Sequence, residues 1–381
     1  MERVMFFITI ILVYLLTNAY VCIRGMQALS GMGALRIVFL VAFIFASISF
    51  IISAPLENHL PLKINSFLQT VGSSWFLIVF YSAVIILFID IFRIANHFFP
   101  FFPNIITENA GMAKLITFAV VALTVSVVCI VGYVRFSNPK TEELEISIAK
   151  TSLDKELTIV ALSDVHLGYT IKKKRLQSYV EQINALNPDI VVIVGDLFDR
   201  NILPVMQQKM NEDLRKISST YGVFAIYGNH EYYGHISTTK DVAVQDFLTS
   251  TGIQFLKDTV VCIEDKLYIV GRDDMTNRHR KPTNELMKDV DKNLPILLLD
   301  HQPFHLEESQ ENGVDLQISG HTHAGQVFPL NHIVNGMYEL GYGYKTKGST
   351  HYYVSSGLGL WGPPFRIGTN SELVKIQLKL K

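Results

Sequence analysis

The sequence predicts a protein in two parts: a region of four transmembrane helices over residues 1–136, and an α/β domain over residues 157–381. Apolar residues make up 49% of the 381 residues, and the long apolar runs are confined to the N-terminal part. Beyond residue 157, short apolar runs typical of strands alternate with polar-apolar stretches typical of helices. A polar segment over residues 137–156 is expected to link the two parts.

Four apolar runs are each close to the length of about 20 residues that crosses a bilayer as a helix. They are Val4–Ile23, Leu35–Ala54, Ser74–Phe98 and Met112–Val134. The first run could instead be a cleaved signal peptide. However, no small-x-small cleavage pattern follows it, and three more runs come after it. We therefore expect a multi-pass integral protein of the plasma or inner membrane.

The charged residues near these runs favour local pairing over a transport path. Asp90 and Arg93 lie three residues apart, so they share one helix face, and charges close to helix ends usually pair locally or reach the interface. The positive charges predict no orientation, because the two sides of the membrane receive equal numbers of them. One side receives Arg3, Lys63, Arg135 and Lys140, and the other receives Arg24, Arg36, Arg93 and Lys114.

The C-terminal part shows the alternation expected of an α/β sheet that is buried on both faces. The expected strands are Leu157–Leu162, Ile190–Val194, Val223–Ile226, Leu267–Val270, Ile296–Leu299 and Leu316–Ile318, with further strands at Tyr352–Val354 and Leu373–Leu378. Helices are expected at Lys173–Leu186 and Val242–Ser250.

Five short polar motifs each follow an apolar run of this domain. They are Asp164-Val165-His166, Gly195-Asp196 with Asp199, Gly228-Asn229-His230-Glu231, Asp300-His301 and Gly320-His321-Thr322-His323. In open α/β sheets, ligand sites form where loops leave the carboxyl ends of strands. Together the motifs supply the carboxylate, amide and imidazole groups that a pair of divalent metals would need.

Taken singly, four of the five motifs also fit structural roles. An aspartate can cap a helix, a Gly-Asp or Gly-Asn pair can form a turn, and a lone loop histidine is usually a hydrogen-bonded surface group. The fifth motif is more specific, because two histidines flanking one residue after a strand often present imidazoles to a metal. The ordered combination predicts a metal site.

In the order and form of these motifs, residues 157–381 resemble the calcineurin-like metallophosphoesterases. The Gly228–Glu231 motif and the stretches Gly271–Asp274, Gly320–Gln326, Ser355–Gly359 and Pro364–Arg366 are most similar to the YkuE-type subgroup. The apolar N-terminal region is similar to that of the transmembrane metallophosphoesterases. The resemblance implies a β-sandwich flanked by helices and a metal-dependent phosphoric ester hydrolase.

The resemblance also implies roles for the residues of the motifs. One divalent metal would be bound by Asp164, His166, Asp196 and His323, and a second by Asp196, Asn229, His301 and His321. Such mixed ligation favours manganese, iron or zinc over calcium. His230 would stabilise or protonate the leaving oxygen. Asp199 is expected outside the metal ligands, orienting a histidine, and Glu231 is expected either to tune His230 or to lie in solvent.

The activity that the resemblance implies is hydrolysis of a phosphoester by a hydroxide shared between the two metals. The four helices favour a phosphodiester or pyrophosphate in a lipid-linked or nucleotide-sugar-lipid substrate, with membrane lipids as the other partner. A net charge of −1 gives no indication of nucleic-acid binding. The alternatives are a catalytically silent membrane receptor or scaffold with the same fold, and a transporter with a regulatory phosphatase domain. The sequence predicts neither an oligomeric state nor a role for the helices beyond anchoring.

Overall fold

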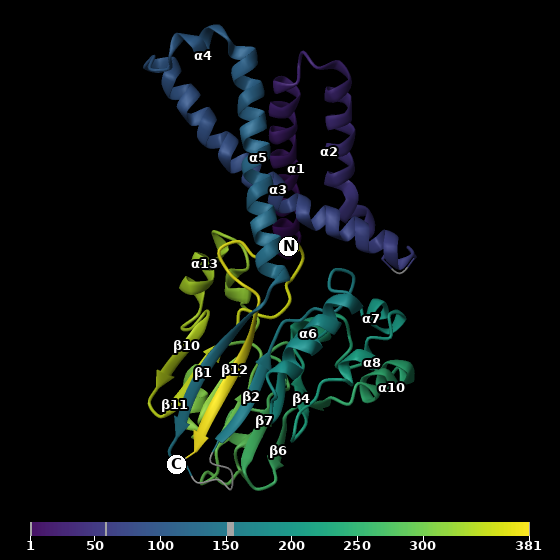
Figure 1. Ribbon diagram of the computed structural model, residues 1–381, viewed down its shortest axis with the longest axis vertical. Coiled ribbons are helices and arrows are strands. Elements are labelled where there is room, and N and C mark those ends of the chain that lie inside the picture. Colours follow the sequence, from purple (N-terminus) through teal and green to yellow (C-terminus); the bar gives the residue numbers. More distant parts are fainter. Residues whose placement is uncertain (1, 58, 151–155, 381) are drawn as a thin grey trace. The chain divides into compact units, whose positions relative to one another are not determined.

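The computed structural model describes residues 2–57, 59–150 and 156–380 (Figure 1). The chain folds into two compact units. One comprises Met1–Gly132 with Gly362–Pro364, and the other comprises Tyr133–Trp361 with Phe365–Lys381. Residues 151–155 of the expected linker lie outside the described residues.

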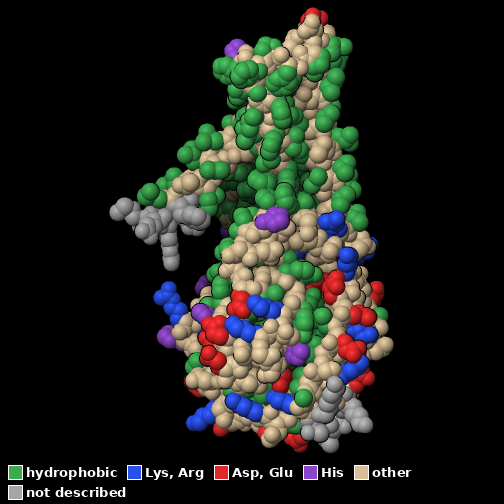
Figure 2. All heavy atoms as spheres, turned by 90° about the vertical axis from the view of Figure 1, so that its left-hand side faces the viewer, with side chains coloured by type: hydrophobic (Ala, Val, Ile, Leu, Met, Phe, Trp, Pro, Cys, Tyr) green, Lys and Arg blue, Asp and Glu red, His purple; other side chains and the backbone are tan. Residues whose placement is uncertain are grey.

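The first unit is built from helices. They are α1 (Glu2–Ala28), α2 (Gly33–Ser53), α3 (Leu62–Phe98), α4 (Asn104–Glu108) and α5 (Ala110–Ser137), whose last residues belong to the second unit. As the sequence predicts, four of the described helices, α1, α2, α3 and α5, are long and apolar enough to cross a membrane. Their surfaces are rich in exposed apolar side chains, and Figure 2 shows hydrophobic side chains distributed over the visible face of these helices with hardly any charged ones. Such a surface is suited to contact with lipid.

Helix α3 is longer than expected, because it begins at Leu62 rather than near Ser74 and contains 37 residues. The stretch between these positions mixes polar and apolar residues, so hydropathy alone does not mark it as part of a span. It contains no proline, and Pro61 directly precedes the helix, where a proline is tolerated. The helix therefore continues through a segment that is less apolar than a bilayer span.

Polar side chains join these helices at two places. The side-chain oxygen of Asn18 accepts hydrogen bonds from Ser47 Oγ at 2.8 Å and from Trp75 Nε1 at 2.9 Å, which links α1, α2 and α3. The predicted local pairing of Asp90 and Arg93 is confirmed by an N–O distance of 3.0 Å. Asp90 also pairs with Arg24 of α1 at 2.6 Å, a contact that the sequence does not predict.

The second unit contains two six-stranded sheets. The first has the strand order β1-β12-β2-β3-β4-β5, formed by Lys140–Ile148, Glu372–Leu380, Glu156–Leu162, Ile190–Val194, Val223–Ile226 and Gln254–Leu256. The second has the order β10-β11-β9-β8-β7-β6, formed by Gly343–Lys347, Thr350–Val354, Leu316–Ser319, Ile296–Leu299, Leu267–Gly271 and Thr259–Ile263. Strands β2 to β5 run parallel in the first sheet, and β7, β8, β9 and β11 run parallel in the second.

The two sheets pack face to face and are covered by helices on their outer faces. In β2, Ile159 and Ala161 point into the apolar layer between the sheets, whereas Val160 and Leu162 point toward the helices. The helices of the unit are α6 (Lys173–Ala185), α7 (Leu203–Gln207), α8 (Asn211–Leu214), α9 (Asn229–Tyr233), α10 (Val242–Ser250), α11 (Thr283–Leu286), α12 (Leu306–Glu311), the 3₁₀ turn η1 (His323–Gly325) and α13 (Leu330–Met337). The expected β-sandwich flanked by helices is confirmed.

The segment expected to be a linker contains a strand of the first sheet. Strand β1 (Lys140–Ile148) pairs in parallel with β12 along its whole length, from Lys140 opposite Glu372 to Ile148 opposite Leu380. The reason is an alternation of apolar and polar residues, in which Ile146 and Ile148 are buried and Glu145 is exposed. The many charged residues of this edge strand conceal that pattern in a composition profile.

Candidate metal centre

The loops that carry the five motifs meet where the two sheets come together. Asp164 and His166 follow β2, Asp196 and Asp199 follow β3, and the Gly228–Glu231 motif follows β4 and begins α9. From the second sheet, His301 follows β8 and the two histidines of the Gly320–His323 motif follow β9. All of the predicted site residues are therefore brought into one cluster, and most of their side chains are buried.

One group of donor atoms in the cluster consists of carboxylate and imidazole groups from three loops. His323 Nε2 lies 3.3 Å from His166 Nε2 and 3.4 Å from Asp164 Oδ1. His166 Nε2 also lies 3.7 Å from Asp196 Oδ2. Burial, and after it the positive charge of His230, lowers the pKa of His166 to about 3, so this imidazole is neutral and has a free lone pair. These donors can surround a cation.

A second group of donors lies on the other side of Asp196. His301 Nε2 is 3.2 Å from Asp196 Oδ2 and 3.2 Å from the side-chain oxygen of Asn229. His321 Nδ1 lies 2.8 Å from the same Asn229 oxygen. Burial followed by the charge of His301 lowers the pKa of His321, which favours the neutral ring that binds metals. Asp196 Oδ2 thus lies near both groups.

The hydrogen bonding of His301 supports a cation in the second group. Its Nδ1 lies 2.8 Å from the carbonyl oxygen of Val194, which only accepts, so Nδ1 carries a proton. In the neutral ring Nε2 is then an acceptor, although it faces the carboxylate of Asp196 and the amide oxygen of Asn229. Three acceptors that converge in a buried space repel one another unless a positive charge lies between them. Against the effect of burial, the charge of Asp196 raises the pKa of His301 well above its usual value, so a proton on Nε2 takes this place when no metal is bound. A divalent metal fits this donor set.

His230 lies beside the donors and is held by Asp199. Its Nδ1 is 2.8 Å from Asp199 Oδ1, and its backbone N–H donates to Asp196 Oδ1 at 2.9 Å. Burial alone would lower the pKa of His230, but the hydrogen bond with Asp199 and the charge of Asp196 raise it above its usual value. The ring is therefore more readily protonated than a free imidazole. Asp199 contacts a histidine, as expected. The side chains of His166, Asp199 and His230 also lie close enough together to hold an ion.

Glu231 has a different setting from either of those expected. It is buried, and its carboxylate accepts hydrogen bonds from three backbone N–H groups. The donors are Asp196 N at 3.1 Å, Phe198 N at 2.9 Å and Gly228 N at 2.7 Å. Burial and the charge of Asp196 raise its pKa to about 8. The solvent-exposed reading of Glu231 is therefore wrong: it joins the loops after β3 and β4 and fixes the position of Asp196.

Several donor residues adopt a left-handed backbone conformation that side-chain-bearing residues rarely adopt. The φ angles are 52° at Asp164, 51° at His166, 52° at Asp196, 69° at His321 and 51° at His323. Each such residue costs of the order of 1–3 kcal/mol, and such residues cluster at functional sites. The surrounding contacts must compensate for this cost, because the side chains converge only with these backbone turns.

Arg366 is one of these supporting contacts, and its role is not apparent from the sequence. Its side chain is fully buried. Its guanidinium donates to the carbonyl oxygen of His323 at 2.9 Å and to those of Gly357 and Gly359 at 3.0 and 2.6 Å. Burial lowers its pKa to about 10, which leaves it charged at neutral pH. Arg366 thus ties the C-terminal segment to the loop that carries His323.

Replacing Arg366 by alanine is expected to weaken metal binding at least tenfold and to lower the thermal unfolding midpoint. Three carbonyl groups would lose a charged donor, and each such hydrogen bond contributes about 1.5–3 kcal/mol. Metal titration and thermal unfolding of the purified protein measure both effects. Arg278→Ala, at an exposed position, is the control. Unchanged metal affinity in Arg366→Ala would contradict the supporting role.

Aromatic side chains next to His230 form a rim that sequence reasoning missed. The rings of Tyr233 and Trp361 lie 6.0 and 6.5 Å from the ring of His230, and both side chains are more than half exposed. The side chain of Gln326 holds the backbone of Trp361 by two hydrogen bonds, of 2.9 and 3.0 Å. An exposed tryptophan fixed beside a polar cluster provides an apolar contact for a ligand.

The fold and the cluster together define an α/β sandwich protein with a candidate metal centre at the ends of its parallel strands. A family model described as calcineurin-like phosphoesterase matches residues 157–325. An uncharacterized metallophosphoesterase of Campylobacter jejuni is 33% identical over 288 residues, which cover 72% of each chain. This chain therefore belongs to the calcineurin-like metallophosphoesterase family.

Other relatives include both predicted subgroups. A Danio rerio protein described as a transmembrane protein with metallophosphoesterase domain is 36% identical, covering 68% of this chain and 62% of that protein. The Bacillus subtilis metallophosphoesterase YkuE is 29% identical, covering 65% of this chain and 89% of that protein. The chain spans less than two thirds of the length of the Danio rerio relative and of two relatives from Helicobacter pylori.

Proposed function

We propose that this protein is a membrane-anchored phosphoesterase that uses two divalent metal ions to hydrolyse a phosphodiester or pyrophosphate bond in a lipid-linked substrate. The main support is the position of Asp196 Oδ2, which lies within 3.7 Å of His166 Nε2 and 3.2 Å of His301 Nε2. A single carboxylate between two groups of buried donors suits a ligand shared by two cations, because it partly neutralises their mutual repulsion.

In this proposal the two groups of donors are the two metal sites. Asp164, His166, Asp196 and His323 hold one metal, and Asp196, Asn229, His301 and His321 hold the other. The imidazole-rich ligation favours manganese, iron or zinc. When bound, the metals would supply a hydroxide near neutral pH and positive charge for the phosphate oxygens.

The residues of the chain then have separate tasks. Glu231 and Arg366 hold the loops of Asp196 and His323 in place through backbone hydrogen bonds. His230, protonated and oriented by Asp199, donates a proton to the leaving oxygen. Neither a serine nor a cysteine nucleophile is needed for this direct displacement.

The lipid-linked substrate is supported by two features of the chain. The four apolar helices of residues 1–136 would anchor the phosphoesterase domain of residues 157–381 in the plasma or inner membrane. Beside the cluster, Tyr233 and Trp361 are exposed. Helix α13, which begins five residues after the end of η1, exposes Leu330, Ile333 and Met337. Apolar side chains near the site would contact the hydrocarbon part of such a substrate.

The first test is hydrolysis of bis-p-nitrophenyl phosphate and p-nitrophenyl phosphate by the full chain in detergent. The metals are removed with a chelator, and manganese, iron or zinc is then restored. We expect metal-restored cleavage that is faster on the diester. Faster cleavage of the monoester would contradict the proposed reaction. No cleavage with both metals bound would favour the catalytically silent receptor or scaffold.

Trp361→Ala is expected to raise the KM for a long-chain diester roughly tenfold and to leave a short-chain diester nearly unchanged. Loss of an aromatic contact of about 1.5 kcal/mol corresponds to this ratio. Hexadecyl and methyl p-nitrophenyl phosphate form a matched pair, because they share the leaving group and differ only in chain length. Tyr344→Ala removes an exposed aromatic residue of β10 and serves as the control. Equal effects on both substrates would argue against recognition of lipid by Trp361.

A further inference from the structure

A large pocket lies among the helices of the first unit, separate from the metal centre. It has a volume of about 990 Å³ and is bounded by residues of α1, α2, α3, α4 and α5. Most of its lining is apolar, including Phe39, Phe43, Trp75 and Val121. Water in a space of this size and polarity would lack hydrogen-bonding partners, so the pocket is suited to a hydrocarbon ligand.

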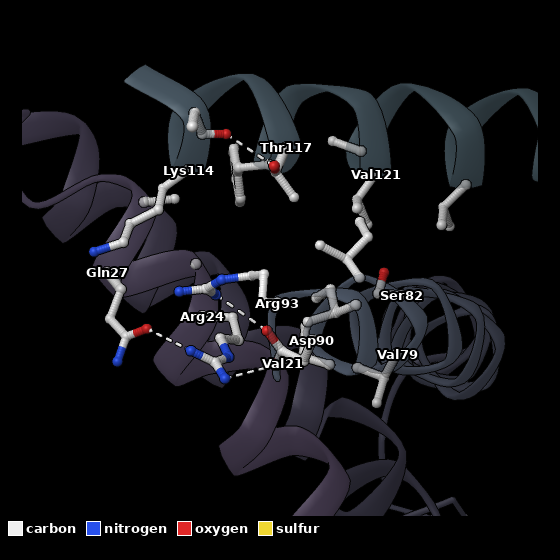
Figure 3. Close-up of a pocket in the computed structure, with 18 of the residues that line it drawn as sticks. Val21, Arg24, Gln27, Val79, Ser82, Asp90, Arg93, Lys114, Thr117 and Val121 are labelled. Carbon is white, nitrogen blue, oxygen red and sulfur yellow. Dashed lines mark hydrogen bonds and ion pairs between the residues drawn. The ribbon is translucent and has the colours of Figure 1, made fainter. Parts of the chain in front are cut away.

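The charged groups of the pocket are gathered at one end. Figure 3 shows Arg24, Arg93 and Lys114 together there, and Val79 and Val121 at the other end. Because the helices that contribute these residues are the ones that would cross a membrane, charges at one end and apolar walls at the other match a molecule with a polar head and a hydrocarbon tail.

The charges at the polar end do not balance. Asp90 is the one acidic residue among the described lining residues, and it pairs with Arg24 at 2.6 Å and Arg93 at 3.0 Å. Among the residues that the structure describes, the side-chain ammonium of Lys114 has no hydrogen-bond or ion-pair partner, although Lys114 lines the pocket. With three cations and one carboxylate, this end carries two excess positive charges. Positive charges beside a hydrocarbon environment are unfavourable unless an anion accompanies them.

The two arginines also retain donors for a ligand. Arg93 uses Nη1 for its contact with Asp90, and its side chain is 45% exposed. Arg24 contacts Asp90 and Gln27, and its side chain is 33% exposed. Guanidinium groups bind phosphate through paired N–H donors, and an ammonium such as that of Lys114 adds a point charge.

We propose that this pocket binds an anionic glycerophospholipid, with the phosphate at Arg24, Arg93 and Lys114 and an acyl chain against the apolar wall. The site is distinct from the metal centre, and its binding is measured without turnover. The proposal of a lipid site can therefore be tested independently of the proposed phosphoesterase activity. It also assigns a role to three of the four cations that the sequence places on the same side of the membrane, namely Arg24, Arg93 and Lys114.

The two tryptophans of the chain make a direct test possible, because Trp75 lines the pocket and Trp361 does not. In a Trp361→Phe background, Trp75 is the single tryptophan, and its emission is the reporter. Phosphatidylglycerol with brominated acyl chains, titrated into detergent micelles of the full chain, is expected to quench Trp75 saturably. Brominated diacylglycerol, which lacks the phosphate, is expected to bind at least tenfold more weakly. Equal quenching by both lipids would overturn the proposal.

Variants then test the polar and apolar ends separately. The double substitution Arg93→Gln with Lys114→Gln is expected to weaken phosphatidylglycerol binding at least tenfold. Lys63→Gln removes a cation of α3 that does not line the pocket and is expected to have no effect. Val121→Phe keeps the charges and fills part of the apolar wall, so it is also expected to weaken binding. An unchanged emission maximum of Trp75 before lipid is added verifies that each variant is folded.

Three further results would overturn the proposal. Equal loss in Lys63→Gln and in the double variant would indicate general attraction to the micelle surface. Full affinity in both the double variant and Val121→Phe would show that quenching arises outside the pocket. Reversal of the quenching by millimolar inorganic phosphate would show that the cations recognise free phosphate, whereas the proposed lipid site predicts little competition.

Discussion

Asp196→Ala is expected to release both metals and to lower the rate of diester hydrolysis on the order of 10³-fold or more. Bound metals stabilise the transition state by several kcal/mol, and each step of about 1.36 kcal/mol corresponds to a factor of ten in rate. The reason is the shared position of this carboxylate, which lies close to His166 in one donor group and to His301 in the other. Its second oxygen also accepts the backbone N–H of His230 at 2.9 Å. The substitution therefore disturbs both donor groups. Metal content per chain and the rate on bis-p-nitrophenyl phosphate are the two measurements.

Two further variants separate the charge of Asp196 from its packing. Asp196→Asn keeps the size and one oxygen for the His230 N–H, so it is expected to fold normally and still lose metal. Asp246→Ala removes an exposed carboxylate of α10 and is expected to retain both metals and full activity. If Asp196→Ala kept two metals per chain, Asp196 would not be their shared ligand.

Much of the fold could be predicted because the buried strands are nearly continuous apolar runs. Strand β3, with the sequence Ile-Val-Val-Ile-Val, is buried at all five positions and was predicted with its observed bounds. Strand β1 was missed because only alternate residues face the core and the others are charged. The partner of β1 is β12, which is more than 220 residues away along the chain, so local sequence carries little information on the pairing.

The candidate site was predictable for a related reason. Its residues follow directly after predictable strands, and the carboxyl ends of parallel strands meet at one edge. Residues that act through long-range contacts were not predictable in this way. Arg366 reaches His323 across 43 residues, and Trp361 approaches His230 across an even longer stretch. Neither residue lies in a strand, and the resemblance that includes Pro364–Arg366 implies no role for Arg366.

The ion pairs of Asp90 in the helical unit also show that local contacts can be predicted from the sequence and long-range contacts cannot. Asp90 and Arg93 lie on one helix face, so their contact follows from the spacing of three residues. Arg24 lies on another helix, and its contact with Asp90 depends on how α1 packs against α3. The sequence supported a structural role for Asp90, whereas the excess of positive charge around it became visible only when the three cations were brought to one pocket.

His230→Gln is expected to keep both metals and to lose activity in proportion to the basicity of the leaving group. General acid assistance contributes about 10²–10⁴-fold, and it matters most when the leaving oxygen is a poor leaving group. We therefore expect a loss of about 10²-fold or more on an alkyl ester and a much smaller loss on a p-nitrophenyl ester, whose anion leaves readily. His279→Gln, at an exposed position, is the control. If His230→Gln instead emptied the metal sites, His230 would be a ligand and not the acid.

The pH dependence of the alkyl ester reaction tests the link between His230 and Asp199. The hydrogen bond to Asp199 and the charge of Asp196 raise the pKa of His230 against the effect of burial. The protonated ring is present below this raised pKa, so activity that depends on it is lost as the pH rises through that value. Asp199→Asn removes one charge that holds the proton and should move this loss of activity to lower pH. If activity in Asp199→Asn were lost at the same alkaline pH as in the unchanged protein, Asp199 would not control the protonation of His230.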